Sequence, residues 1–143
     1  MIANLNHSSA HTLSIRIYYE DTDAGGIVYH ANYLKFAERG RTEYLRSLGY
    51  DHQQVMAEYK LILVVRHIEI DYRAPARLDD LLEVRTETIA CGNTSIGMKQ
   101  QVYKGEKLLA ELKVTVVAVT PEGKAVRLPP HLRQIFGSHK PAE

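Results

Sequence analysis

Five segments of the chain are rich in apolar residues, and most of them alternate apolar with polar positions, as β-strands with one buried face do. The clearest strand pattern places every second residue of residues 108–119 on one face, namely Leu108, Ala110, Leu112, Val114, Val116 and Ala118. The other four segments are residues 13–19, 61–72, 81–89 and 95–103. Turn clusters separate the last four segments, which we therefore predict to pair as antiparallel strands.

Between the first and second strand segments the apolar period changes to that of a helix. From residue 31 to 48 a mostly apolar stripe recurs every three or four positions, formed by Leu34, Ala37, Arg41, Tyr44, Leu45 and Leu48. Gly49 is well placed to end this helix. Gly40 inside it costs about 1 kcal/mol relative to alanine, and either a close approach to a sheet or a tolerated defect explains it. A shorter helix is expected over residues 131–136, after two prolines.

The order of these elements predicts an α+β fold in which one long helix lies beside a five-stranded antiparallel sheet. The length of 143 residues suits a single domain over residues 1–143, and residues 1–11 are polar enough to form a loose terminus. A single helix covers only part of one sheet face. The remaining apolar surface therefore predicts an oligomer.

Composition excludes several classes of function. The formal net charge of +1, without a basic block, gives no reason to expect a nucleic-acid partner. The longest apolar run, residues 61–65, is far too short to span a bilayer, and the polar N-terminus has no secretory pattern. Cys91 is the only cysteine, so no intrachain disulfide can form. These features together favour the cytoplasm.

The most informative segment is the loop between the first strand and the long helix. It holds three carboxylates, Glu20, Asp21 and Asp23, followed by a glycine pair and His30. A carboxylate at this place can act as a base or a nucleophile. The free N–H groups of the helix start that follows can hold a developing negative charge. The loop is therefore a candidate reaction centre.

Residues 19–33, read as YEDTDAGGIVYHANY and followed by Phe36, Glu38, Arg41, Thr42 and Glu43, resemble the hotdog-fold acyl-CoA thioesterases. The resemblance is strongest to the YbgC branch, close to the 4-hydroxybenzoyl-CoA thioesterase type. It implies a hotdog fold, in which a curved antiparallel sheet wraps the long helix. It also implies homodimers joined edge to edge, commonly paired into homotetramers, with active sites at the subunit interface. Acyl-CoA is then the substrate, so no separate cofactor is expected.

The resemblance also implies roles for individual residues. Asp23 matches the catalytic carboxylate, which attacks the thioester or activates water; by its residue type alone it is more often an ordinary turn or cap residue. At His30 two interpretations stay open, because either its backbone N–H polarises the thioester carbonyl or its imidazole acts on the substrate. Asp21 is expected to brace the loop, and Glu38 is the alternative base. Substrate binding is assigned to Gly25, Gly26, Ile27, Val28 and Tyr29.

Other kinds of site have weaker support. No metal site is predicted, because the loop has neither a C-x-x-C pair nor a second histidine. Tyr18, Tyr19, Tyr29 and Tyr33 either line an acyl pocket or pack in the core. The phosphates of coenzyme A need cations, and nothing selects among Arg66, Arg73, Arg77 and Lys99. Two competing functions keep the same fold: hydrolysis of acyl-carrier-protein thioesters, and acyl-CoA binding without turnover.

Overall fold

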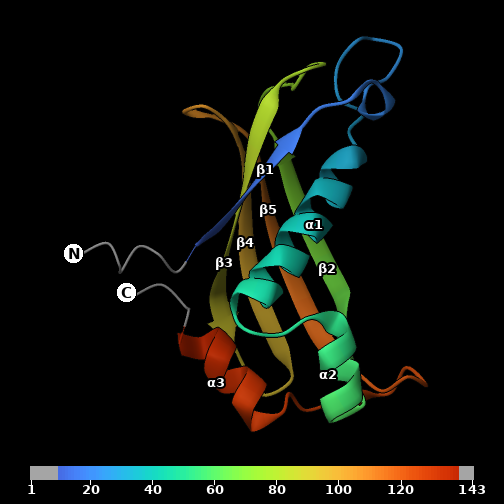
Figure 1. The fold of residues 1–143 in the computed structure, drawn as a ribbon, viewed down its shortest axis with the longest axis vertical. Coiled ribbons are helices and arrows are strands. Elements are labelled where there is room, and N and C mark those ends of the chain that lie inside the picture. Colours follow the sequence, from blue (N-terminus) through green and yellow to red (C-terminus); the bar gives the residue numbers. More distant parts are fainter. Residues whose placement is uncertain (1–9, 139–143) are drawn as a thin grey trace, which may run out of the picture.

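A computed structural model describes residues 10–138, which form one antiparallel sheet with helices on one side and at one end (Figure 1). The sheet order is β1-β3-β4-β5-β2, and a short strand, β6, pairs with β5. The strands are β1 (His11–Arg16), β2 (Ile62–Tyr72), β3 (Leu81–Cys91), β4 (Ser95–Lys104), β5 (Lys107–Val119) and β6 (Ala125–Val126). The bounds of β2 to β5 lie within two residues of the segments predicted from the apolar pattern, whereas β1 ends at Arg16, three residues before the predicted end; the antiparallel sheet is confirmed. The alternating apolar positions explain why, since one face of each strand packs into the core.

Within residues 10–138 three α-helices accompany the sheet: α1 (Asn32–Ser47), α2 (His52–Tyr59) and α3 (Pro130–Ser138). Figure 1 shows α1 along one face of the sheet, with α2 and α3 at its far end. The α1 prediction of residues 31–48 is confirmed within one residue at each end, and Gly49 follows it with a φ of 102°. The sequence pattern gave no sign of α2, which begins with a capping box between Asp51 and Gln54.

The middle of α1 lies unusually close to the sheet, and Gly40 makes this possible. A Cβ atom on Gly40 would stand 2.8 Å from Val84 Cγ1 and 3.0 Å from Thr86 Oγ1. The close-approach explanation for this glycine is therefore correct. Beneath it the fully buried Gln100 donates to the carbonyl oxygen of Ala37 (2.8 Å) and to Thr86 Oγ1 (2.9 Å). These bonds tie the helix backbone directly to the sheet.

One detail of the predicted core is wrong. Leu109 is buried and Leu108 is half-exposed, the reverse of the regular alternation, because the pairing of β4 with β5 shifts register between Val102 and Tyr103. A β-bulge of this kind moves the residues beyond it to the opposite face. The chain also begins β1 at His11, inside the segment expected to be loose; residues 1–9 lie outside the described part.

None of the helices within residues 10–138 combines the length and apolar character that crossing a membrane requires. The main core instead lies between α1 and the sheet. It is built around Phe36, Tyr44, Leu82, Ile96 and Leu112. This core fixes the position of the first turn of α1, where the candidate site lies.

Candidate active site

The carboxylate-rich loop leaves β1 and returns on itself before α1 begins. A single 3-10 turn, Tyr19–Asp21, starts it, and an isolated antiparallel bridge between Thr22 and Val28 closes it. A second bridge joins Ile27 to Arg77, in the segment between β2 and β3. Gly26 at the tip has a φ of 84°, a left-handed conformation that favours glycine. The backbone therefore holds residues 22–28 in one defined turn.

Asp21 braces this turn from inside, as the sequence analysis expected. Its carboxylate is buried and accepts hydrogen bonds at both oxygens, from the Tyr18 N–H (2.8 Å) and from the Asn32 side-chain amide (3.0 Å). Its carbonyl oxygen also accepts from the Tyr29 N–H at 2.9 Å. Asp21 thus links the start of the loop to the first residue of α1 and leaves no carboxylate oxygen for chemistry.

Asp23 has a different environment from Asp21, only two residues away. Its side chain is exposed, and one oxygen, Oδ1, accepts from the Gly25 N–H at 2.9 Å. The other oxygen makes no hydrogen bond within residues 10–138. Asp23 therefore has an open carboxylate oxygen, while its backbone is fixed by the Ile27 carbonyl and the Gly26 N–H.

His30 lies at the other end of the loop, just before α1. Its ring is exposed and contacts the rings of Tyr29 (4.7 Å between centroids) and Tyr72 (6.3 Å). It lines a cavity of about 310 Å³ together with Ile27, Val28, Tyr33, Tyr72, Arg73, Ala74 and Pro75. Within residues 10–138 no hydrogen bond or ring contact is recorded between His30 and Asp23, and Asp23 is not among the residues that line the cavity at His30. The two predicted catalytic residues share one loop without touching.

The first turn of α1 presents backbone donors beside this cavity. Hydrogen bonds are recorded for the N–H groups of Asn32, Tyr33 and Leu34, all to carbonyls of the turn. None is recorded within residues 10–138 for the N–H groups of His30 and Ala31. Open donors at a helix start are suited to a developing oxyanion.

The predicted substrate-binding residues separate into two groups. Ile27 and Val28 line the 310 Å³ cavity. Gly25 and Gly26 are exposed at the turn, and Tyr29 is exposed outside the cavity, with its ring tilted at 55° to that of His30. Of the four clustered tyrosines only Tyr33 packs in the core, with its hydroxyl accepting from the Ala76 N–H at 3.1 Å. Tyr18 and Tyr19 are exposed.

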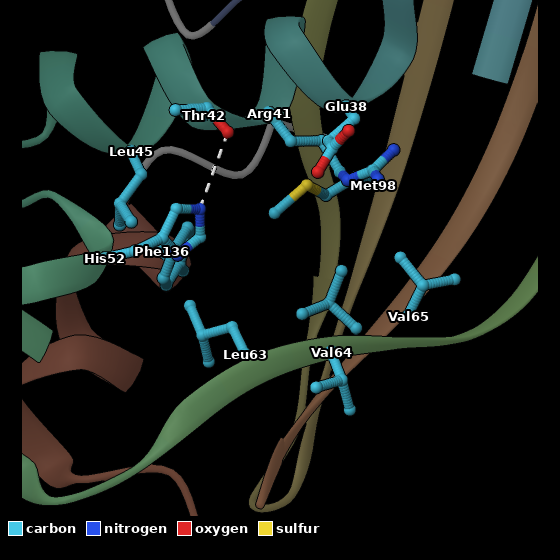
Figure 2. Close-up of a pocket in the computed structure, with 11 residues that line it drawn as sticks. Glu38, Arg41, Thr42, Leu45, His52, Leu63, Val64, Val65, Met98 and Phe136 are labelled. Atoms are coloured by element: carbon cyan, nitrogen blue, oxygen red, sulfur yellow. Dashed lines mark hydrogen bonds between the residues drawn. The ribbon is translucent and has the colours of Figure 1, made fainter. Parts of the chain in front are cut away.

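A second cavity of about 290 Å³, which the sequence pattern did not reveal, opens between α1, α2 and β2 (Figure 2). Its walls are mainly apolar and include Leu45, Leu63, Val64, Val65, Met98, Val116 and Phe136. Glu38, the alternative base, lines this cavity and not the one at His30. Arg41 also lines it, and burial lowers the pKa of its guanidinium, which donates to Gln100 Oε1 at 3.0 Å. Figure 2 shows the hydrogen bond between the Thr42 hydroxyl and the His52 ring at one side of this cavity.

Across residues 10–138 no group of three or more histidine, cysteine, aspartate or glutamate side chains gathers in a ligating arrangement. The carboxylates of Asp21 and Asp23 also have different surroundings, one buried and bonded to N–H donors and the other exposed.

The fold and the loop together define a class, the α+β hotdog proteins with a carboxylate loop before the central helix. Residues 18–136 match the model of the thioesterase-like superfamily. The chain belongs to this superfamily. It is 50% identical over 108 residues to the acyl-CoA thioester hydrolase YbgC of Escherichia coli, covering 75% of this chain and 80% of the relative.

Two further relatives extend the match over more of the chain. The acyl-CoA thioesterase YbgC of Haemophilus influenzae is 43% identical over 123 residues, which is 85% of this chain and 90% of that protein. The crystal structure of a probable thioesterase from Bartonella henselae has a TM-score of 0.81 at 39% identity, covering 84% of this chain and 99% of that one. These likenesses confirm the hotdog fold and the resemblance to the YbgC branch.

Proposed function

We propose that the protein is an acyl-CoA thioesterase, which hydrolyses the thioester of an acyl-CoA to a free acid and coenzyme A. The observation that carries this proposal is one loop that holds both an exposed carboxylate, Asp23, and two open helix-start donors, the N–H groups of His30 and Ala31. The YbgC relatives, named as acyl-CoA thioesterases or thioester hydrolases, support the same chemistry.

The proposed reaction needs a carboxylate and an oxyanion site, and it can follow two routes. As a base, Asp23 takes a proton from water, and the water oxygen adds to the thioester carbonyl. As a nucleophile, its oxygen adds directly, and water later hydrolyses the mixed anhydride. In both routes the carbonyl oxygen becomes an oxyanion, which accepts a hydrogen bond from the His30 N–H. When this tetrahedral intermediate collapses, the C–S bond breaks and the thiolate of coenzyme A leaves. The thiolate then takes a proton. Loss of a comparable donor costs other enzymes about 3 kcal/mol.

The test is release of free thiol from a panel of acyl-CoAs of different chain length and aromatic content. Asp23→Asn should lower turnover by roughly 10³-fold, within the range that a positioned acid–base group contributes, and should leave the fold intact because the side chain is exposed. Asp79→Asn is a matched control. Asp79 is exposed and has a φ of 74°, which asparagine also tolerates.

Two results would count against this proposal. Near-normal turnover in folded Asp23→Asn would show that Asp23 is not the catalytic carboxylate. Glu38 would then become the candidate base. Binding of acyl-CoA without any thiol release by the unmodified protein would favour a non-catalytic binding module.

We further infer that the protein acts as a homodimer paired along β2. Among the described strands β2 has a neighbour on one side only, β5, so one backbone edge of eleven residues stays open. Ile62, Val65 and Tyr72 on this strand are 37%, 42% and 46% exposed. Antiparallel pairing of two β2 strands about a two-fold axis places the Ile62 end of one against the Tyr72 end of the other. The apolar cavity of one copy would then adjoin the His30 cavity of its partner.

Light scattering tests the assembly. A mass of twice 16.2 kDa, or four times if dimers pair further, is expected, and a mass of 16.2 kDa at micromolar concentration would contradict it. Val65→Asp, which puts a charge on the open strand, should shift the mass toward that of one chain. The cytoplasm is the proposed location, because a single cysteine forms no intrachain disulfide and suits a reducing compartment.

A further inference from the structure

Two consecutive peptide groups form the bend just before α1. The first joins Tyr29 to His30 and the second joins His30 to Ala31. In a trans peptide the carbonyl and the N–H point in opposite directions within one plane. Whatever holds the carbonyl oxygen therefore also sets the direction of the N–H on the other side.

Each carbonyl of this pair is held by a different partner. The Tyr29 oxygen accepts from the Asn32 N–H at 2.9 Å, a bond internal to the turn. The His30 oxygen accepts from the Tyr72 hydroxyl at 2.8 Å, while its bond from the Tyr33 N–H is long, at 3.4 Å. The hydroxyl of Tyr72 is thus the shorter restraint on the second peptide, and it comes from the last residue of β2, 42 positions along the chain.

From these contacts we infer that Tyr72 is a positioning residue for the thioesterase reaction: its hydroxyl fixes the His30–Ala31 peptide so that the Ala31 N–H joins the His30 N–H as a second oxyanion donor. This inference rests on the proposed function and deepens it. Ala31 has helical dihedrals (φ −71°, ψ −18°), so its N–H continues the direction of the helix start.

The hydroxyl also strengthens the donor that it orients. A hydrogen bond accepted by a carbonyl polarises the whole peptide and makes its N–H a better donor. Burial raises the pKa of Tyr72, so the hydroxyl keeps its proton as a donor through neutral and mildly alkaline pH. Its ring meets those of His30 and Tyr33 edge-on, with centroids 6.3 and 5.4 Å apart, which holds the hydroxyl in place.

The experiment compares the unmodified enzyme with Tyr72→Phe, which removes one oxygen and keeps both ring contacts. The oxyanion exists only after attack on the carbonyl, so the loss should fall on kcat, by about tenfold, with KM nearly unchanged. Tyr50→Phe is the matched control. It removes a tyrosine hydroxyl that bonds to Tyr59 at 3.2 Å, and it should leave kcat unchanged.

A second readout reports on the carbonyl directly. In an Asp23→Asn background, an acyl-CoA labelled with ¹³C at the thioester carbonyl is bound and its infrared stretch recorded. Adding Tyr72→Phe should move that stretch back toward its frequency in water, because the carbonyl loses polarisation. A purely structural role for Tyr72 would lower the melting temperature without moving this band.

The outcomes separate this inference from the proposed function. Unchanged kcat in Tyr72→Phe, beside an inactive Asp23→Asn, would overturn the role of Tyr72 and leave the thioesterase proposal standing. A loss that appears in KM alone, or only as lowered stability with an unmoved carbonyl band, would overturn it too. Absence of thiol release from every acyl-CoA by the unmodified enzyme would overturn both.

Discussion

The first turn of α1 and its middle turns are held by different forces. At the first turn, polar groups are placed by two hydrogen bonds. The buried Asn32 amide donates to the Asp21 carboxylate, and the exposed Tyr72 hydroxyl donates to the His30 carbonyl. Eight residues further on, Gly40 lies against a fully buried face of the sheet, where Thr86 and Gln100 leave no free space. Packing therefore fixes the position of the helix on the sheet. A few hydrogen bonds fix the direction of the backbone N–H groups at its first turn. Stability and activity should respond to different substitutions.

The largest expected effect belongs to the packed middle of the helix. Gly40→Val inserts a Cβ and two methyl groups where a Cβ alone would stand 2.8 Å from Val84. We expect a loss of about 2–3 kcal/mol in the free energy of unfolding, as overpacked cores show, measured by urea denaturation. The folded fraction should keep its kcat. Gly137→Val is the control, because within residues 10–138 a Cβ added there would meet no atom within 4 Å beyond its own helix backbone and chain neighbours, and stability should hardly change. An unchanged free energy of unfolding in Gly40→Val would contradict the close packing of Gly40 against the sheet.

The next largest effect tests the polar brace. In the native protein the two oxygens of the Asp21 carboxylate accept from the Tyr18 N–H and the Asn32 amide. In Asp21→Asn the side chain has one oxygen acceptor and an NH2 donor, so one of these two N–H donors loses its partner. We expect kcat to fall by about 30-fold, since a buried donor left unsatisfied costs about 1–3 kcal/mol. Adding Asn32→Asp supplies the missing acceptor and should restore kcat to within about threefold of the original. A double variant as slow as the single one would argue against this brace.

A smaller effect is expected at His30 itself. If its backbone N–H holds the oxyanion, His30→Ala keeps that donor and lowers turnover by about tenfold or less, at or below the low end for an acid–base group. Turnover measured against pH decides between backbone and side chain. A loss as deep as that of Asp23→Asn, with a changed pH profile, would give the imidazole the catalytic role.

The smallest effect concerns pH and the segment that supports the loop. Burial raises the pKa of the Asp80 carboxyl, but the hydrogen bonds from Lys104 and the Arg77 N–H, with their charges, outweigh it and lower the pKa below 3.8. Such a carboxyl stabilises the fold at neutral pH, and this contribution is lost as pH falls through the lowered pKa. Lys104→Met should therefore lower the urea midpoint slightly at neutral pH and not in strong acid. An equal effect at both would contradict the assignment.

The sequence predicted most of the fold, because the strands and α1 carry long, regular apolar patterns. It could not predict α2, which is eight residues long with a single buried side chain, Val55. Nor could it place the bulge that buries Leu109 in the position expected of Leu108. Both depend on pairing and local capping, not on periodicity.

The sequence also predicted only part of the candidate site, namely the residues that lie close together along the chain. Asp21, Asp23 and His30 lie in one short segment, so local sequence indicated them. Tyr72 approaches from a strand 42 residues away, and nothing in its immediate sequence marks its hydroxyl as a partner of His30. The cavity beside α1 gathers residues from six elements and has no sequence signature.

Tyr72 belongs to two structures at once, the open edge strand and the bend before α1. Pairing along β2 would therefore do more than cover apolar surface, because it would steady the residue that orients the second donor. The activity of each chain would then depend on the protein concentration, because concentration sets the fraction of chains that are dimeric. On dilution below the dissociation constant of the dimer, the activity per molecule of enzyme would fall while each chain stayed folded, and it would return on concentration.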